Sequence, residues 1–213
     1  MKVFVIGANG HVGRLTSQLL SERGNEVVAG IRKPEQAAFF EDHDIKTAHV
    51  DLLGSPEELA VTLDGFEAVI FTAGSGGKTG DDMTLMVDLD GAVKSMQAAQ
   101  IAGVKRYVMV SALWAENRNR WNKTIRPYYA AKFYADDWLR HRTNLTYTIV
   151  EPGTLTFDQG TGKISTDGIE GGSIAREDVA STIAATLEQP QTSNKTIPII
   201  IGETPISEAL KNF

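Results

Sequence analysis

Residues 2–33 read KVFVIGANGHVGRLTSQLLSERGNEVVAGIRK, and this stretch decides the fold. An apolar run from Val3 to Ile6 leads directly into a glycine-rich turn, residues 7–13. A segment with helically spaced apolar side chains follows, and then a second apolar run from Val27 to Ile31. Strand, glycine-rich turn, helix and strand form a βαβ unit, with which open α/β sheets bind dinucleotides. The sequence therefore predicts an α/β fold, a Rossmann-type doubly wound parallel sheet with helices on both faces.

Three glycines of the turn each have a separate steric role. Gly7 allows the chain to leave the first strand sharply, Gly10 lets the backbone approach a pyrophosphate, and Gly13 lets the helix pack closely on the sheet. Such a pattern alone is a weak signal, but its place between a strand and a helix makes it a strong one. We expect cofactor contacts from the residues of this turn, namely Gly7, Asn9, Gly10, His11, Val12 and Gly13.

The end of the second expected strand indicates which nicotinamide cofactor binds. An acidic residue there bonds to the adenosine ribose of NAD, whereas a basic residue accommodates the 2′-phosphate of NADP. Here Arg32 and Lys33 follow Ile31, and the first carboxylate is Glu35. Two cations in this place favour NADP(H) over NAD(H). The alternative interpretation is a basic turn that is merely solvated.

Two further apolar runs end beside the expected cofactor. Residues 45–50 predict a third strand and residues 68–71 a fourth. Because parallel strands share one carboxyl edge, the residues that follow them should contact the cofactor: Asp51, Leu52, Thr72, Ala73 and Gly74. Asp51 has two interpretations, a contact to the adenine amino group or the start of the turn before a helix at Ser55. The glycine-rich residues 76–80 lack the spacing of a phosphate-binding loop and predict a loop beside the site.

The remaining chain continues the alternation of helix and strand without an internal repeat or a linker, which predicts a single domain over residues 1–213. Residues from about 153 to 213 should add a small substrate-side region. The loop at 113–126 is either a lid over the substrate or is anchored by its tryptophans. The other expected elements are a helix at 82–103, a strand at 104–110, a helix from near 127, a strand at 147–150, a loop or short hairpin at 153–173, a helix that starts within 173–178, a strand at 196–201 and a helix at 205–210.

Composition excludes several classes of function. The net charge of −6 argues against nucleic acid as the main partner, because phosphate binding requires a concentrated positive surface. The absence of cysteine excludes disulfides, thiolate metal ligands and a cysteine nucleophile, and no metal site is expected. No apolar run reaches the roughly 18 residues of a membrane span, and the N-terminus lacks the pattern of a secretory signal. We expect a cytoplasmic protein without a membrane partner.

Ser111, Tyr128 and Lys132 form a candidate catalytic group. Tyr128 and Lys132 share a helix face because they are four residues apart, and Ser111 ends the fifth expected strand. A free tyrosine has a pKa of about 10, which a neighbouring ammonium group lowers by stabilising the phenolate. The phenol could then protonate a carbonyl oxygen that Ser111 holds, as NADPH delivers hydride. The alternative is chance, because Tyr-x-x-x-Lys is short and frequent in helices.

Taken in order, these motifs resemble those of the short-chain dehydrogenase/reductase superfamily, especially its short, atypical bacterial NAD(P)-binding members of the epimerase/dehydratase-like kind. The resemblance spans nearly the whole chain, and it implies a Rossmann fold and cofactor contacts that include Lys132, Pro152 and Thr154. The matching stretches are GANGHVG (7–13), RKP (32–34), DL (51–52), TAG (72–74), VDLDG (87–91), GVKRYVMVSA (103–112), Tyr128-x-x-x-Lys132, YTIVEPG (147–153) and REDVA (176–180).

Two departures from that family pattern bear on activity. Asp88 stands where the well-studied dehydrogenases have an asparagine that supports a proton relay to the lysine. A carboxylate here should pair with Lys132 and weaken its help to Tyr128, or replace the relay. Only about 60 residues follow Gly153, so the substrate pocket should be small or open.

Three functions remain open on this basis. The first is an NADP(H)-dependent oxidoreductase that acts on a small-molecule substrate, a carbonyl, quinone or flavin-like acceptor. The second is a non-catalytic, NADP-sensing regulatory protein, as some short relatives that resemble nitrogen-metabolite regulators are. The third is a nucleotide-sugar epimerase or dehydratase, for which little chain remains to hold the sugar. By analogy with relatives, the helices at 82–103 and 127–142 could form a homodimer.

Overall fold

A nine-stranded, mostly parallel sheet forms the centre of the molecule in the computed structural model, which describes residues 1–77 and 79–213. Lys78, within the loop expected at 76–80, lies outside the described residues. The strand order β11-β8-β10-β6-β5-β4-β1-β2-β3 confirms the predicted doubly wound topology, with β1 parallel to both β2 and β4. The parallel strands are β1 (Lys2–Ile6), β2 (Glu26–Ile31), β3 (Lys46–His49), β4 (Ala68–Phe71), β5 (Arg106–Val110), β6 (Thr146–Pro152) and β10 (Lys195–Ile201).

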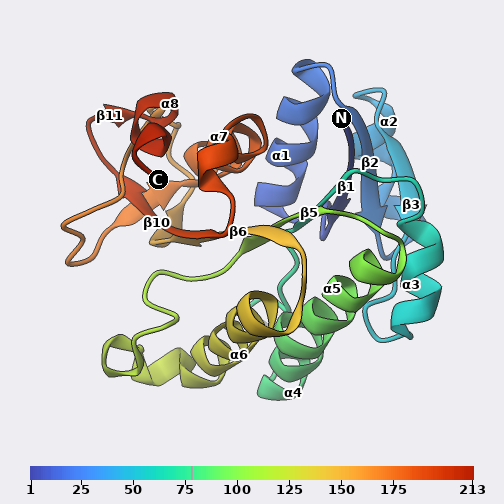
Figure 1. The fold of residues 1–213 in the computed structure, drawn as a ribbon, viewed down its shortest axis with the longest axis horizontal. Coiled ribbons are helices and arrows are strands. Elements are labelled where there is room, and N and C mark those ends of the chain that lie inside the picture. Colours follow the sequence, from blue (N-terminus) through green and yellow to red (C-terminus); the bar gives the residue numbers. More distant parts are fainter. Residues whose placement is uncertain (78) are drawn as a thin grey trace.

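Helices cover both faces of the sheet (Figure 1). On one face α1 packs against α7, and on the other α3 packs against α5 while α6 packs against the helical segment that precedes α5. Each face has its own hydrophobic core, as a doubly wound sheet requires. The helices are α1 (His11–Glu22), α2 (Ala38–Glu41), α3 (Pro56–Thr62), α4 (Asp81–Met83), α5 (Ala92–Ile101), α6 (Arg126–Arg142), α7 (Arg176–Glu188) and α8 (Ile206–Ala209).

The glycine-rich turn has the steric demands that the sequence indicated. Gly7 has a φ of 78°, and a Cβ atom there would lie 2.5 Å from the backbone of Ala73. A Cβ atom on Gly13 would lie 2.5 Å from the carbonyl oxygen of Gly7, so α1 could not start so close to β1 with any larger residue. The turn therefore brings the N-terminus of α1 to the carboxyl edge of the sheet.

The helix expected at 82–103 is present, but part of it is π-helical and not α-helical. Between α4 and α5 the segment Thr84–Gly91 is π-helical, a form that is rare and often marks functional sites. Within it the side chain of Asp88 is only 1% exposed. The wider turn thus directs a carboxylate inward from the long helix.

The region after β6 departs from the expected loop or short hairpin. Its three-residue strands pair with distant segments: β7 (Thr154–Thr156) with β9 (Ser173–Ala175), and β8 (Lys163–Ser165) with β10 and β11 (Thr204–Pro205). Strands this short show no periodicity in the sequence, so their partners could not be predicted from it. The short helix α2 was likewise not predicted.

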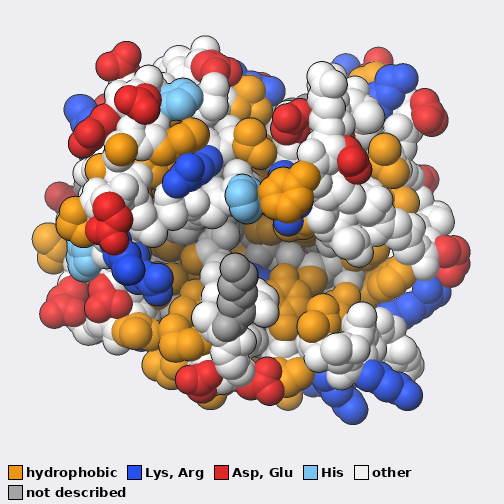
Figure 2. Space-filling view, turned by 180° about the vertical axis from the view of Figure 1, so that it is seen from behind, with side chains coloured by type: hydrophobic (Ala, Val, Ile, Leu, Met, Phe, Trp, Pro, Cys, Tyr) orange, Lys and Arg blue, Asp and Glu red, His pale blue; other side chains and the backbone are white. Residues whose placement is uncertain are grey.

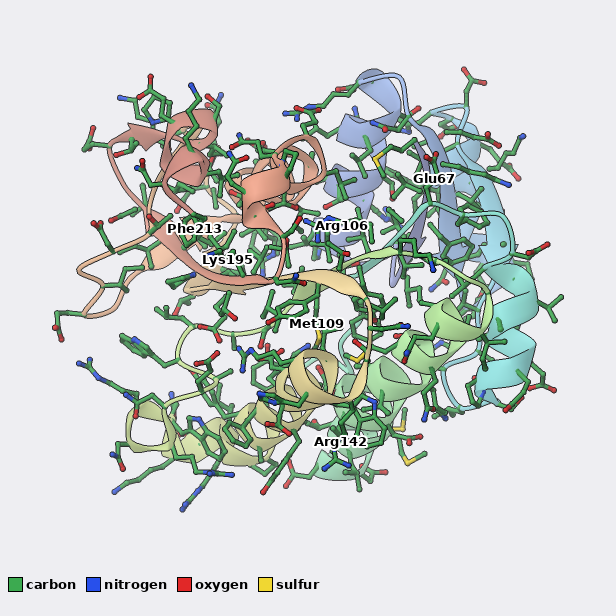
Figure 3. All side chains as sticks on the ribbon, viewed as in Figure 1. Glu67, Arg106, Met109, Arg142, Lys195 and Phe213 are labelled. Carbon is green, nitrogen blue, oxygen red and sulfur yellow. The ribbon has the colours of Figure 1, made fainter. Side chains whose placement is uncertain are left out.

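One partly buried arginine links α7 to the sheet. Arg106, labelled near the centre of Figure 3, starts β5. Its guanidinium donates to the carbonyl oxygens of Thr146 at 3.1 Å and Thr186 at 3.1 Å, and to the Thr148 hydroxyl at 2.5 Å. Burial lowers its pKa to about 10.

Among the described residues, no helix has the length and apolar character needed to cross a bilayer.

Candidate active site

A cavity of about 760 Å³ opens at the carboxyl edge of the sheet. Figure 2 shows the molecule hollowed near its centre, with hydrophobic side chains around the hollow. The cavity is lined by the segments that follow β4, β5 and β6, by the π-helical segment and by the start of α6. It contains ten of the residues expected at the site: Val12, Thr72, Ala73, Gly74, Asp88, Ser111, Tyr128, Lys132, Pro152 and Thr154.

Lys132 lines this cavity and is 3% exposed. Its Nζ lies 3.4 Å from Oδ1 of Asp88 and donates to the carbonyl oxygen of Val110 at 3.2 Å. The same Nζ lies 5.6 Å from the centre of the Tyr128 ring. Burial lowers the pKa of Lys132, but the nearby Tyr128 and carboxylates outweigh burial, and the net effect raises it. The lysine is therefore charged at neutral pH, and the expected pair with Asp88 is present.

Tyr128 retains its proton more strongly than the sequence analysis expected. Burial raises the pKa of the phenol, Lys132 lowers it, and Asp88 raises it again. Lys132 lowers this pKa as expected, but burial outweighs the ammonium group, so the net shift is upward and not downward. A phenol that stays protonated at neutral pH can donate a proton and cannot act as a base.

Ser111 is hydrogen-bonded to Asp136, a buried residue that was not among the predicted site residues. Its hydroxyl donates to Oδ2 of Asp136 at 2.5 Å, and both side chains are buried. Asp136 follows Lys132 by four residues, as Lys132 follows Tyr128, so the three lie along one face of α6. This repeated spacing was the signal that could have revealed Asp136.

Glu151 is a second buried carboxyl group in the same region, on β6. Burial is the main cause that raises the pKa of Asp136 to about 7 and that of Glu151 to about 8. Oδ1 of Asp136 and Oε1 of Glu151 are buried and have no hydrogen-bond partner within the described part of the chain. Two buried carboxyl groups with raised pKa values, one of them bonded to Ser111, therefore lie outside the lining of the cavity.

The glycine-rich turn fits a dinucleotide pyrophosphate. Gly10 caps α1 without a side-chain hydrogen bond, so the first amide groups of α1 are not occupied by a capping side chain. Free amide groups at the positive end of a helix bind phosphate oxygens. Thr72 supports the turn, since its hydroxyl donates to the carbonyl oxygens of Ile6 at 3.0 Å and Gly7 at 3.2 Å.

The other predicted cofactor residues lie outside the 760 Å³ cavity. Arg32 and Lys33 are exposed at the end of β2, where their backbone amides donate to the side chain of Gln36. Asp51 accepts a hydrogen bond from the Leu53 amide at 2.8 Å, which supports its interpretation as a turn residue. The adenine contact stays a prediction. The remaining members of this set are Gly7, Asn9, Gly10, His11, Gly13 and Leu52.

Arg14 is a further basic residue beside the turn that was missed. Its Nη2 donates to Oδ1 of Asn9 at 2.5 Å, and its guanidinium stacks 4.5 Å above the ring of Phe39. Its place directly after Gly13 in the sequence was the available signal. It adds positive charge near the expected phosphate groups.

The loop at 113–126 is anchored through a tryptophan. The indole of Trp121 donates to the carbonyl oxygen of Ala115 at 2.9 Å and stacks on Tyr129. Trp114, which has a φ of 65°, lines the cavity. These contacts support the anchored interpretation, and the lid stays a prediction.

Comparisons with known proteins agree with this geometry. Residues 7–190 match the model of a family described as NAD(P)H-binding. The chain is 50% identical to the uncharacterized sugar epimerase YhfK of Bacillus subtilis (strain 168), with 100% of both chains covered. Among solved structures, the oxidoreductase ylbE from Lactococcus lactis is 38% identical with a TM-score of 0.92, covering 100% of this chain and 96% of that one. A Bacillus halodurans protein is 36% identical over 100% of both chains, with a TM-score of 0.93.

Proposed function

This chain belongs to the NAD(P)H-binding family, and on that premise we propose that it is an NADP(H)-dependent oxidoreductase for a small carbonyl, quinone or flavin-like acceptor. One observation carries the proposal: Ser111, Tyr128 and Lys132 line a single cavity at the edge of the sheet where the glycine-rich turn lies. The similarity to the oxidoreductase ylbE supports it.

Each of Ser111, Tyr128 and Lys132 has a different role in the reduction of a carbonyl acceptor. The glycine-rich turn, residues 7–13, would hold a reduced nicotinamide dinucleotide, which would supply hydride for the carbonyl carbon. Tyr128 donates its proton to the carbonyl oxygen, so C=O becomes CH–OH and a phenolate is left. Lys132 then stabilises that phenolate, since its charged Nζ lies 5.6 Å from the ring centre. Ser111 holds the carbonyl oxygen in place.

NADP(H) is the proposed form of the cofactor. Arg32 and Lys33 follow β2, and the only ion pair they form within the described residues is an exposed one, between Lys33 and Glu35 at 3.8 Å. A guanidinium group is suited to bidentate binding of a phosphate. Arg14, bonded to Asn9 of the glycine-rich turn, is a further cation available to the cofactor phosphates.

The test measures NADPH oxidation with a panel of aldehydes, ketones, quinones and flavins. We expect activity with at least one class, and a loss of at least about a hundredfold in kcat for a carbonyl acceptor in Tyr128→Phe. The matched control is Tyr134→Phe, because Tyr134 is on the same helix and 51% exposed outside the cavity. Activity on quinone or flavin that survives Tyr128→Phe would assign direct hydride transfer to that acceptor.

Two results would overturn the proposal. Tight NADPH binding without oxidation by any acceptor would assign the chain as a cofactor-sensing protein. Interconversion of nucleotide sugars without net consumption of cofactor would assign an epimerase, the activity for which the Bacillus subtilis relative is named. Both assays use the same full-length protein.

A further inference from the structure

The hydrogen bond between Ser111 and Asp136 lies at the boundary between the cavity and a buried polar cluster. Ser111 lines the cavity, whereas Asp136 does not and is 0% exposed. The two oxygens are 2.5 Å apart, with the serine hydroxyl as donor. Asp136 therefore reaches a ligand in the cavity through its hydrogen bond to Ser111, and its charge also acts on Lys132 and Tyr128.

The hydrogen bond to Asp136 uses the only hydrogen that the Ser111 hydroxyl can donate. A hydroxyl group has one hydrogen to donate and two lone pairs that accept. While Ser111 donates to an ionised Asp136, it offers only lone pairs to the cavity, and these repel the oxygen of a carbonyl substrate. If Asp136 carries a proton, the carboxyl group donates to Ser111 instead, and the serine hydrogen is free for the substrate oxygen.

We propose that Asp136 is a positioning residue whose proton sets the direction of the Ser111 hydroxyl, so that only the protonated form presents a donor to a carbonyl oxygen in the cavity. This inference rests on the proposed reductase function for its catalytic consequence. The hydrogen-bond switch itself requires only Ser111, Asp136 and the groups around them.

The charged groups around Asp136 leave it without a fixed counter-ion. On its own helix, Lys132 is paired with Asp88, while Arg140 pairs with Glu116 of the neighbouring loop and donates to the Thr196 hydroxyl at 2.9 Å. No ion pair to Asp136 is formed within residues 1–77 and 79–213. Its second oxygen, Oδ1, has no partner in that part of the chain. A buried carboxylate with one hydrogen bond and no counter-ion readily takes a proton.

Glu151 is a second buried carboxyl group, and it interacts with Asp136 through charge. It faces the same cluster from β6, and Asp136, Glu116 and burial all raise its pKa, whereas Arg140 and a hydrogen bond from the Trp114 backbone lower it. Its Oε1 is also unpartnered among the described residues. The two carboxyl groups do not form a metal site, because no group of three or more His, Asp or Glu in the described part of the chain is arranged to hold a metal ion. An ionised Asp136 therefore disfavours the ionised form of Glu151.

The direct test is isotope-edited infrared spectroscopy of the full chain with labelled aspartate, from about pH 5 to pH 9. We expect a protonated aspartate band that disappears with a midpoint near neutral pH. In Ser111→Ala this midpoint should rise by about one pH unit, because the ionised carboxylate loses its hydrogen-bond donor. Asp136→Asn should remove the band, and the control Asp137→Asn should not, since Asp137 pairs with His141 on the exposed face.

The kinetic test separates positioning from structure. With a carbonyl acceptor, kcat of the native chain should fall by about tenfold as pH rises through the infrared midpoint, and Asp136→Asn should abolish this step. An aspartate band that is absent, or whose midpoint does not move in Ser111→Ala, would overturn the inference even if Asp136→Asn does not fold. If the infrared shift occurs but no acceptor is reduced, the switch stands and only the proposed function fails.

Discussion

Nζ of Lys132 lies 3.4 Å from Oδ1 of Asp88, and both side chains are almost completely buried. The carboxylate also accepts a hydrogen bond from the Ser75 amide at 2.9 Å, so it connects α6 with the segment after β4. Asp88 raises the pKa of both Lys132 and Tyr128. Asp88 thereby gives the buried Lys132 a counter-ion and offsets part of the effect of Lys132 on Tyr128, whose pKa is raised mainly by burial.

Asp88→Asn should destabilise the protein by about 3 kcal/mol, because the change leaves a buried ammonium group without its counter-ion. It should also lower the pKa of Tyr128, since the carboxylate that raises it is gone. Urea unfolding measures the first effect, and ultraviolet titration of the phenol measures the second. Asp90→Asn is the control: its pair with Lys94 is half-exposed and should contribute less than about 1 kcal/mol. Equal losses in both variants would contradict this account.

The pH dependence of stability follows from Glu151 and Asp136. Folding raises the pKa of these carboxyl groups from 4.5 to about 8 and from 3.8 to about 7. Above the unfolded values the unfolded chain loses these protons first. The free energy of unfolding should therefore fall as pH rises from about 4 to 8, by an amount on the order of a few kcal/mol.

Glu151→Gln tests this sign directly. The variant should equal the native chain near pH 4 and be more stable near pH 8, as measured by urea unfolding at each pH. Glu188→Gln, which removes an exposed carboxylate paired with Arg23, should follow the native profile. A Glu151→Gln variant that loses the same stability at every pH would show that folding does not shift the pKa of Glu151.

The sequence predicted the fold because its evidence was local. The βαβ unit, Ser111 at the end of β5 and the four-residue spacing of Tyr128 and Lys132 are all readable along the chain, and the structure brings these side chains to one cavity. Two features could not be predicted from the sequence, because one depends on desolvation in the folded state and the other on pairing between segments far apart in the chain. The raised pKa of Tyr128 is a result of burial, and the partners of β8 are set by contacts between remote segments.

Gly7→Ala should disrupt the cofactor turn, because the new Cβ would lie 2.5 Å from the backbone of Ala73 at a φ of 78°. We expect a loss of about 3 kcal/mol or more in the free energy of unfolding. Gly24→Ala is the matched control, since Gly24 has a φ of 80° with no atom within 4 Å of the added Cβ. It should lose only about 1 kcal/mol from backbone strain. Similar losses would show that strain alone, without the clash, accounts for the requirement for glycine.

Cofactor preference should reverse with the charge after β2. In a double variant, Arg32→Glu with Lys33→Glu, two carboxylates would face the 2′-phosphate, and we expect Kd for NADPH to rise at least about a hundredfold while Kd for NADH changes less than about threefold. Both constants can be measured by nucleotide fluorescence. The control is Lys46→Glu, which removes an exposed cation that is paired with Glu26 on the neighbouring strand. Its two dissociation constants should stay near those of the native chain. If the double variant weakens NADPH and NADH equally, the two cations stabilise the turn and do not select the 2′-phosphate.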